Sequence, residues 1–125
     1  MNEPLTLSTA QSAVDESILE AGGYWSPLAN LARLFEECGE LARAVNQSYG
    51  PKVRKPGEDA VAVQEELGDC LYVLLVLANS LGVDAEAGLE ASLAKVRQRS
   101  LRPGGDAVAG AGSPEMPAET QSKQD

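Results

Sequence analysis

LARLFEECGELARAVNQSYG, residues 31–50, repeats apolar side chains at the spacing of an α-helix. Leu31, Leu34, Cys38, Leu41 and Val45 recur at intervals of three or four residues, so one face of the segment is apolar from end to end. The remaining positions are mostly charged, polar or small. The stretch therefore predicts an amphipathic helix that must pack its apolar face against another part of the protein.

Start and stop signals predict four helices, and no segment has the alternating pattern of a β-strand. Ser26 and Pro27 begin the second helix, because a capping hydroxyl precedes a proline at a position where its missing N–H is harmless. Ser8 and Asp84 are predicted to cap the first and fourth helices, and Ser8 forms a capping-box pattern with Gln11. The third helix is expected to begin near Glu58 or Asp59. The predicted boundaries are about residues 8–21, 27–49, 58–81 and 85–99. The fold class is all-α.

The second and third helices are predicted to be antiparallel neighbours, because a short connector rich in proline and glycine joins them. The third helix contains CLYVLLVLA, residues 70–78, which is apolar nearly all round. A lone surface helix cannot tolerate this composition, so the helix must be central or covered by a second subunit. We expect a four-helix fold with an antiparallel central pair and a bundle completed by oligomerisation, as a homodimer or homotetramer.

Charge and hydropathy exclude several classes of partner. Nineteen acidic residues against ten basic ones give a net charge of −9, which disfavours non-specific binding to nucleic acid or to an anionic membrane. The longest apolar run is far shorter than the roughly 20 residues of a transmembrane helix, and the first residues lack a signal-peptide pattern. We expect a cytoplasmic protein with reduced cysteines and no nucleic-acid or membrane partner.

Two acidic motifs, EECGE and EELGD, lie on the second and third predicted helices. Glu37 and Glu40 are three residues apart, as are Glu66 and Asp69, so each pair shares one helix face. Glu40 lies roughly 15 Å along its helix from the connector, and Glu66 lies roughly 12 Å from it. Because the helices are antiparallel, the four carboxylates are predicted to converge at similar height.

Four converging carboxylates favour a bound divalent cation. Two carboxylates about 5 Å apart repel each other by roughly 3 kcal/mol at an effective dielectric constant near 20, and a cation removes that cost. The chain has no histidine, and oxygen-only ligands favour Mg²⁺, or Mn²⁺ as a substitute, over zinc. Gly39 and Gly68 leave space for close helix approach or for a ligand. The alternative is that each acidic pair lies on an ordinary solvated helix face.

These motifs resemble the MazG-like nucleotide pyrophosphohydrolases of the all-α NTP pyrophosphatase superfamily. The signature of that family is E-E-x-x-E followed by E-x-x-D, and the resemblance extends over roughly residues 20–100. It implies a domain over residues 1–102, followed by a tail over 103–125 whose Ala, Gly, Pro and polar composition predicts disorder. It also implies Mg²⁺-dependent hydrolysis of a nucleoside triphosphate to a monophosphate and pyrophosphate, in nucleotide-pool house-cleaning.

The resemblance assigns roles to the five acidic residues that fill the signature. Glu37, Glu40, Glu66 and Asp69 are expected to hold Mg²⁺ against the phosphate oxygens and to orient a water for in-line attack. Glu36, turned by about 100° from its neighbour on the helix, is the candidate for positioning or deprotonating that water, or for contacting a further ion.

Basic and aromatic residues are the candidates for binding the substrate. Lys95 and Arg99 match a K-x-x-x-R pattern of the family on one helix face, although a basic last turn is also favoured by the helix dipole. Trp25, Phe35 and Tyr72 are typical core side chains. Trp25 is the best candidate among them to stack on a base, because its ring can stack while its N–H stays hydrogen-bonded.

Two other functions fit the same sequence. A phosphoribosyl-ATP pyrophosphohydrolase or a dUTPase-like enzyme of the same superfamily would differ only in the pocket for base and sugar. A non-enzymatic helical module could present the acidic face to a basic partner, although such a patch needs no fixed spacing of its charges. Nucleophilic catalysis by a Ser-His or Cys-His pair is excluded by the absence of histidine.

Overall fold

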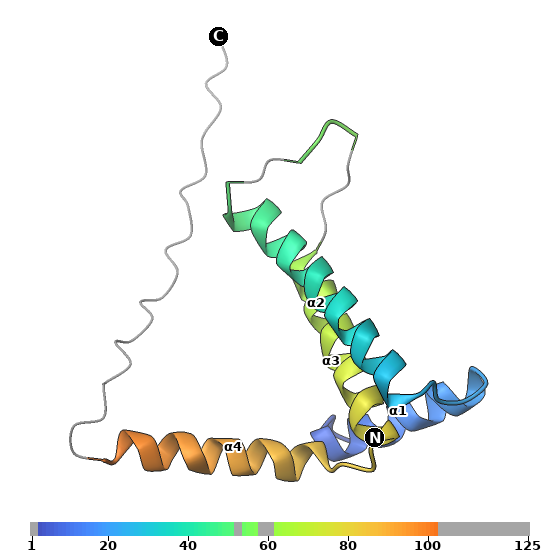
Figure 1. Cartoon of the computed structure of the whole chain (residues 1–125), viewed down its shortest axis with the longest axis vertical. Coiled ribbons are helices and arrows are strands. Elements are labelled where there is room, and N and C mark those ends of the chain that lie inside the picture. Colours follow the sequence, from blue (N-terminus) through green and yellow to red (C-terminus); the bar gives the residue numbers. More distant parts are fainter. Residues whose placement is uncertain (1–2, 52–53, 58–61, 103–125) are drawn as a thin grey trace. The chain divides into compact units, whose positions relative to one another are not determined.

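The chain folds into α-helices (Figure 1). A computed structural model describes residues 3–51, 54–57 and 62–102, and over these residues it contains no strand. The helices are α1 (Leu7–Glu20), α2 (Pro27–Tyr49), α3 (Val63–Ser80) and α4 (Ala85–Ser100). The predicted all-α fold with four helices is confirmed. The predicted tail, residues 103–125, lies outside the described residues.

The N-terminus of α1 differs from the prediction. Thr6, not Ser8, is the capping residue: its hydroxyl accepts a hydrogen bond from the backbone N–H of Thr9 at 3.1 Å. The Thr9 hydroxyl oxygen in turn accepts the backbone N–H of Thr6 at 2.8 Å. This reciprocal capping box pairs two orphan N–H groups at once, and it places the cap two residues upstream of the predicted one.

The predicted start of α3 near Glu58 or Asp59 is wrong for the described residues. Ala62 has an extended backbone, with φ −74° and ψ 118°, and the helix begins after it. The first turn of α3 therefore carries Glu65 and Glu66, where the positive end of the helix dipole favours negative charge. Residues 58–61 lie outside the described residues.

The other two predicted caps are confirmed. The Ser26 hydroxyl accepts the backbone N–H of Ala29 at 3.3 Å at the start of α2, and Pro27 occupies the first helical position. The Asp84 carboxylate accepts the backbone N–H of Ala87 at 3.1 Å at the start of α4. These caps fix the points at which the chain enters the two helices.

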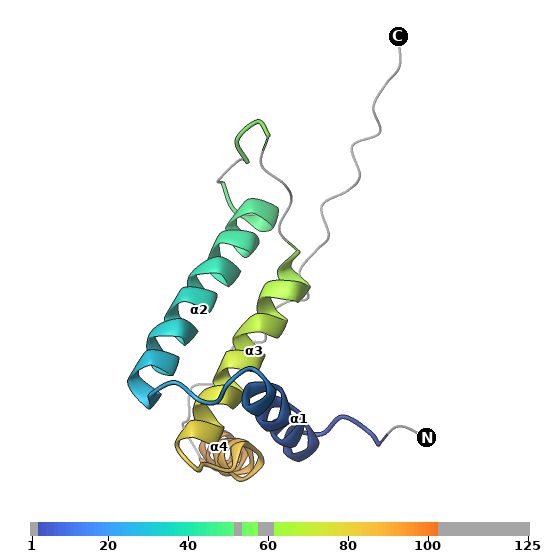
Figure 2. The same cartoon turned by 90° about the vertical axis from the view of Figure 1, so that its right-hand side faces the viewer.

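Helices α2 and α3 form an antiparallel pair, and α1 packs across α3 at the end away from the connecting loop (Figure 1, Figure 2). The core cluster joins Val14 of α1 to Leu75 and Val76 of α3. Two further apolar side chains, Ala44 of α2 and Val73 of α3, are almost completely buried. The predicted antiparallel central pair is thus confirmed, with α1 covering one end of it.

A polar network ties α1 to the corner between α3 and α4. The side-chain amide of Gln11 donates to the Asn79 side chain at 3.0 Å and to the Val83 carbonyl at 2.9 Å, while its oxygen accepts the Ala85 N–H at 2.9 Å. Asn79 returns a hydrogen bond to the Gln11 carbonyl at 2.9 Å. Gly82, at φ +65°, makes the turn that brings these groups together. The Gln11 side chain therefore supplies hydrogen-bond partners to α3, to the turn after it and to the start of α4.

Replacing Gln11 by alanine should lower the free energy of unfolding by about 2 kcal/mol, because it leaves partly buried donors and acceptors without their partner. Urea unfolding followed by circular dichroism measures the change. Ser12→Ala is the matched control, since among the described residues the Ser12 hydroxyl bonds to the carbonyl of Ser8, within its own helix. Equal losses in the two variants would contradict a special role for the network.

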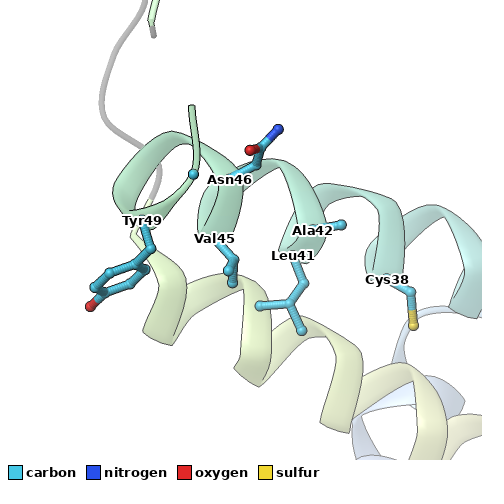
Figure 3. Close-up of a pocket in the computed structure, with 7 residues that line it drawn as sticks. Cys38, Leu41, Ala42, Val45, Asn46 and Tyr49 are labelled. Atoms are coloured by element: carbon cyan, nitrogen blue, oxygen red, sulfur yellow. The ribbon is translucent and has the colours of Figure 1, made fainter. Parts of the chain in front are cut away.

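Many large apolar side chains of the central pair are exposed. We call two sets of them the two apolar stripes: Leu28, Leu31, Phe35, Val45 and Tyr49 on α2, and Leu67, Leu71 and Leu74 on α3 together with Leu81 at its C-terminal cap. In Figure 3, Cys38, Leu41, Val45 and Tyr49 project from one side of α2 and Asn46 from another, and all five line an open hollow. The described core leaves these surfaces uncovered.

The chain divides into two compact units, residues 1–91 and 92–125. The first contains α1, α2, α3 and the start of α4, and the second contains the rest of α4. Over the described residues, no single helix is long and apolar enough to cross a membrane; α3 and α4 pass the test of length and composition only together, as a bent pair.

Candidate functional site

Three carboxylates from the facing helices α2 and α3 converge. Glu37 of α2 and Glu66 and Asp69 of α3 each offer one oxygen, and these oxygens all lie within 4.8 Å of one another. Glu37 and Glu66 are partly buried, and Asp69 is exposed. Because α2 and α3 are antiparallel, these residues lie at the same level along the two helices, as the sequence predicts. We call these three residues the carboxylate cluster.

Glu40 and Glu36 lie outside the carboxylate cluster. The Glu40 carboxylate is 3.7 Å from the guanidinium of Arg43, one helical turn further along α2. Its charge nevertheless acts on Glu66. Glu36 is exposed on α2. The structure therefore brings together three of the four predicted metal ligands and leaves the fourth beside them.

Glu66 is the carboxylate most affected by its surroundings. Partial removal from water raises its pKa above the ordinary glutamate value, and the negative charges of neighbouring carboxylates raise it further: Asp69, Glu40, Glu37 and Glu65. Ionisation of Glu66 is thus more costly in the folded protein than in a free glutamate. A nearby cation would offset that cost.

The glycines of the two motifs have open space beside them. A Cβ atom built on Gly39 or Gly68 would meet no other atom within 4 Å among the described residues. Close approach of α2 and α3 therefore does not require these glycines, contrary to one of the two sequence interpretations. The space beside the carboxylates remains available to a ligand or to another subunit.

The positively charged side chain of Arg33 lies between the carboxylate cluster and the exposed ring of Trp25. The Arg33 guanidinium is 5.8 Å from the centre of the Trp25 ring, and its Nε is 3.8 Å from Oε1 of Glu37. Trp25 is 63% exposed and Phe35 is 70% exposed, so the expectation that they belong to the core is wrong for this chain. Asn30, which is buried, donates to the Trp25 carbonyl at 3.1 Å and fixes the backbone there. The sequence analysis missed Arg33, although its position one turn before Glu37 could have shown it.

The two cysteines of the chain lie beside the cluster. Cys38 of α2 is exposed, Cys70 of α3 is buried, and both are free. Their side chains are in hydrogen-bond contact, and burial together with this contact raises the pKa of the Cys70 thiol.

Lys95 and Arg99 lie one turn apart on the part of α4 that belongs to the second unit. Both side chains are exposed. Tyr72, by contrast, packs against the core cluster, and its hydroxyl is 3.2 Å from that of Ser17.

Comparison with known proteins identifies the family. Residues 25–102 match the MazG nucleotide pyrophosphohydrolase domain. The uncharacterized protein YpjD of Bacillus subtilis strain 168 is 46% identical over 95 residues, which are 75% of this chain and 86% of YpjD.

Two crystal structures are similar to this chain. That of Bacillus subtilis YpjD has a TM-score of 0.67 at 45% identity, covering 75% of this chain and 97% of YpjD. That of the Bacillus-conserved MazG protein, a nucleotide pyrophosphohydrolase, has a TM-score of 0.62 at 43% identity, covering 76% and 93%. Because the matched domain spans more than half of the chain and includes both acidic motifs, the chain belongs to the MazG nucleotide pyrophosphohydrolase family.

Proposed function

We propose that the protein is an Mg²⁺-dependent pyrophosphohydrolase that converts a nucleoside or deoxynucleoside triphosphate to the monophosphate and pyrophosphate. The observation that supports this proposal is the convergence of Glu37, Glu66 and Asp69 from two facing helices of a MazG-family domain. Its expected role is the removal of unwanted nucleotides from the cytoplasmic pool.

The residues of the cluster fit a hard divalent cation. Their ligand atoms are carboxylate oxygens, and Mg²⁺ and Mn²⁺ prefer such oxygens. Glu37, Glu66 and Asp69 would hold the cation, with Glu40 beside them as a further ligand. A cation bound there would neutralise charge on the phosphates and polarise the phosphorus for attack.

Other residues are proposed to handle the water and the nucleotide. Glu36, adjacent to the cluster, would position the attacking water and accept its proton. Lys95 and Arg99 would contact the phosphates, since both are exposed cations one turn apart on α4. Trp25 would stack on the base, because its ring is exposed to solvent rather than packed in the core.

We also propose that a second copy of the chain covers the two apolar stripes, as a homodimer or as part of a homotetramer. The first unit has a small buried core, while both helices of its central pair carry exposed leucines and α2 also carries exposed aromatic residues. A monomer in solution rarely leaves so many large apolar side chains exposed together. Two helix pairs packed face to face would make a four-helix bundle, which is the common way for such a layer to bury its apolar face.

Incubation with a panel of ribo-, deoxy- and damaged nucleoside triphosphates, with and without Mg²⁺, tests the activity. Monophosphate and pyrophosphate formed only with the metal would support the proposal. Stepwise release of orthophosphate would contradict it. Turnover of phosphoribosyl-ATP or dUTP alone would identify the more specialised enzymes of the superfamily, and no turnover of any compound would favour a non-enzymatic interaction module.

The affinity for Mn²⁺ should fall as the pH is lowered from neutral toward the raised pKa of Glu66, because the proton and the metal compete for this carboxylate. Isothermal titration at several pH values measures the change. Glu66→Gln is the control, since it removes this proton and should flatten the pH dependence over the range. An affinity that is constant with pH would exclude Glu66 as a ligand.

A further inference from the structure

The Arg33 side chain lies between the exposed Trp25 ring and the carboxylate cluster, where hydrogen bonds hold the neighbouring backbone in place. Buried Asn30 holds the Trp25 carbonyl, and the Ser26 hydroxyl caps the helix immediately after it, so the backbone that carries the ring is fixed. Arg33 then contacts the ring on one side and approaches Glu37 on the other. Along the chain the order is the Trp25 ring just before α2, then the Arg33 guanidinium and the Glu37 carboxylate on α2.

The ion pair alone does not explain this arrangement. At 3.8 Å, the contact between Arg33 and Glu37 is longer than a hydrogen bond. In a helix, an arginine that precedes a glutamate by four residues is also the less favourable order of the two charges. Both side chains are accessible to water, at 34% and 23%, where such pairs contribute little to stability. The guanidinium therefore keeps donors that a ligand can use.

The charges around the cluster oppose an anionic ligand unless cations lie among them. The three cluster carboxylates, Glu40 and the neighbouring Glu36 and Glu65 are acidic, whereas Arg33 and Arg43 supply positive charge. A bound divalent cation and Arg33 would both reduce the negative charge that a polyphosphate meets. Removing Arg33 would increase the repulsion of the phosphates.

We propose that Arg33 is a substrate-binding residue that contacts the polyphosphate of a nucleotide whose base stacks on Trp25 and whose phosphates lie at the carboxylate cluster. The planar guanidinium suits two oxygens of a phosphate at once, and its contact with the ring limits the orientations that it must give up on binding. This inference rests on the proposed pyrophosphohydrolase function, and it adds a phosphate contact on α2 itself.

The only tryptophan of the chain makes the test direct, because intrinsic fluorescence reports on Trp25 alone. Wild type, Arg33→Lys, Arg33→Met and Arg43→Met are titrated with an α,β-methylene nucleoside triphosphate and Mg²⁺. Arg43→Met removes the same charge from the same helix, next to Glu40 instead of the ring. We expect Arg33→Met to weaken binding of the analogue by about tenfold or more, Arg33→Lys to weaken it less, and Arg43→Met to change it least.

Mn²⁺ binding without nucleotide separates a contact with the substrate from damage to the fold. Since the guanidinium and the metal compete for Glu37, Arg33→Met should bind Mn²⁺ as tightly as wild type or more tightly, while KM for the triphosphate rises more than kcat falls. Loss of Mn²⁺ binding in this variant would overturn the inference. An unchanged affinity for the analogue, with wild type active, would overturn it and leave the proposed function intact; a wild type that neither binds nor cleaves any nucleotide would refute the function itself.

Discussion

Replacing Glu66 by glutamine should lower the rate of pyrophosphate release by about 100-fold or more, and should at the same time stabilise the metal-free protein. The activity falls because one of the three converging oxygens can no longer carry the negative charge that holds the cation. The stability rises because the pKa of Glu66 is raised in the folded state, so the ionised carboxylate at neutral pH opposes folding. The protonated form of Glu66 is the one that favours folding, so its stabilisation is fully present below the ordinary glutamate pKa and is lost as the pH rises through the raised value.

Thermal unfolding with and without Mg²⁺ measures both halves of this prediction. Wild type should gain stability from Mg²⁺, because a ligand that binds only the native state stabilises it, and the variant should gain less. Glu65→Gln is the matched control: it removes the same charge one residue away, from an exposed side chain outside the carboxylate cluster. Equal activity of Glu66→Gln and wild type, or equal behaviour of the two glutamine variants, would refute the assignment.

Replacing Leu74 by glutamate should convert the assembled protein to monomers and lower its stability. Leu74 belongs to the α3 stripe and is 48% exposed within a single chain. If a second copy covers it, the new carboxylate would be buried without a partner, which costs several kcal/mol. Light scattering coupled to gel filtration measures the mass, and thermal unfolding at several protein concentrations measures the linked loss of stability.

Leu19→Glu is the control for this change. Leu19 is 60% exposed on α1, outside the two apolar stripes, so the substitution adds the same charge to a comparably exposed leucine. It should leave the mass and the melting temperature close to those of wild type. A wild-type chain that is already monomeric at micromolar concentration would show that another partner, or none, covers the stripes.

The sequence predicted the helices and the position of the cluster because both depend on local chemistry. Ser26 with Pro27, and Asp84, are caps that act within four residues, so their effect can be read without a fold. The convergence of Glu37 with Glu66 follows from the rise of a helix and from a connector that makes the two helices antiparallel.

Other features depend on contacts between segments far apart in the chain, which periodicity cannot show. Gln11 bonds to Asn79, Val83 and Ala85, and nothing in its own neighbourhood marks it as more than a polar residue of α1. The exposure of Trp25 likewise depends on the packing of the other helices, which leave its ring accessible to solvent. The cap of α1 was missed for a different reason, since two equivalent signals lie two residues apart and only the geometry selects Thr6.

The open space beside Gly39 and Gly68 has a consequence for protein engineering. An alanine at either position meets no atom of the described chain and should make the isolated helix more stable by about 1 kcal/mol. A design that optimises the single chain would therefore remove both glycines. In the assembled, ligand-bound enzyme that we propose, the same methyl groups would occupy the space next to the acidic residues, so the gain in stability would come at the expense of turnover. The two glycines are thus places where selection for folding and selection for catalysis act in opposite directions.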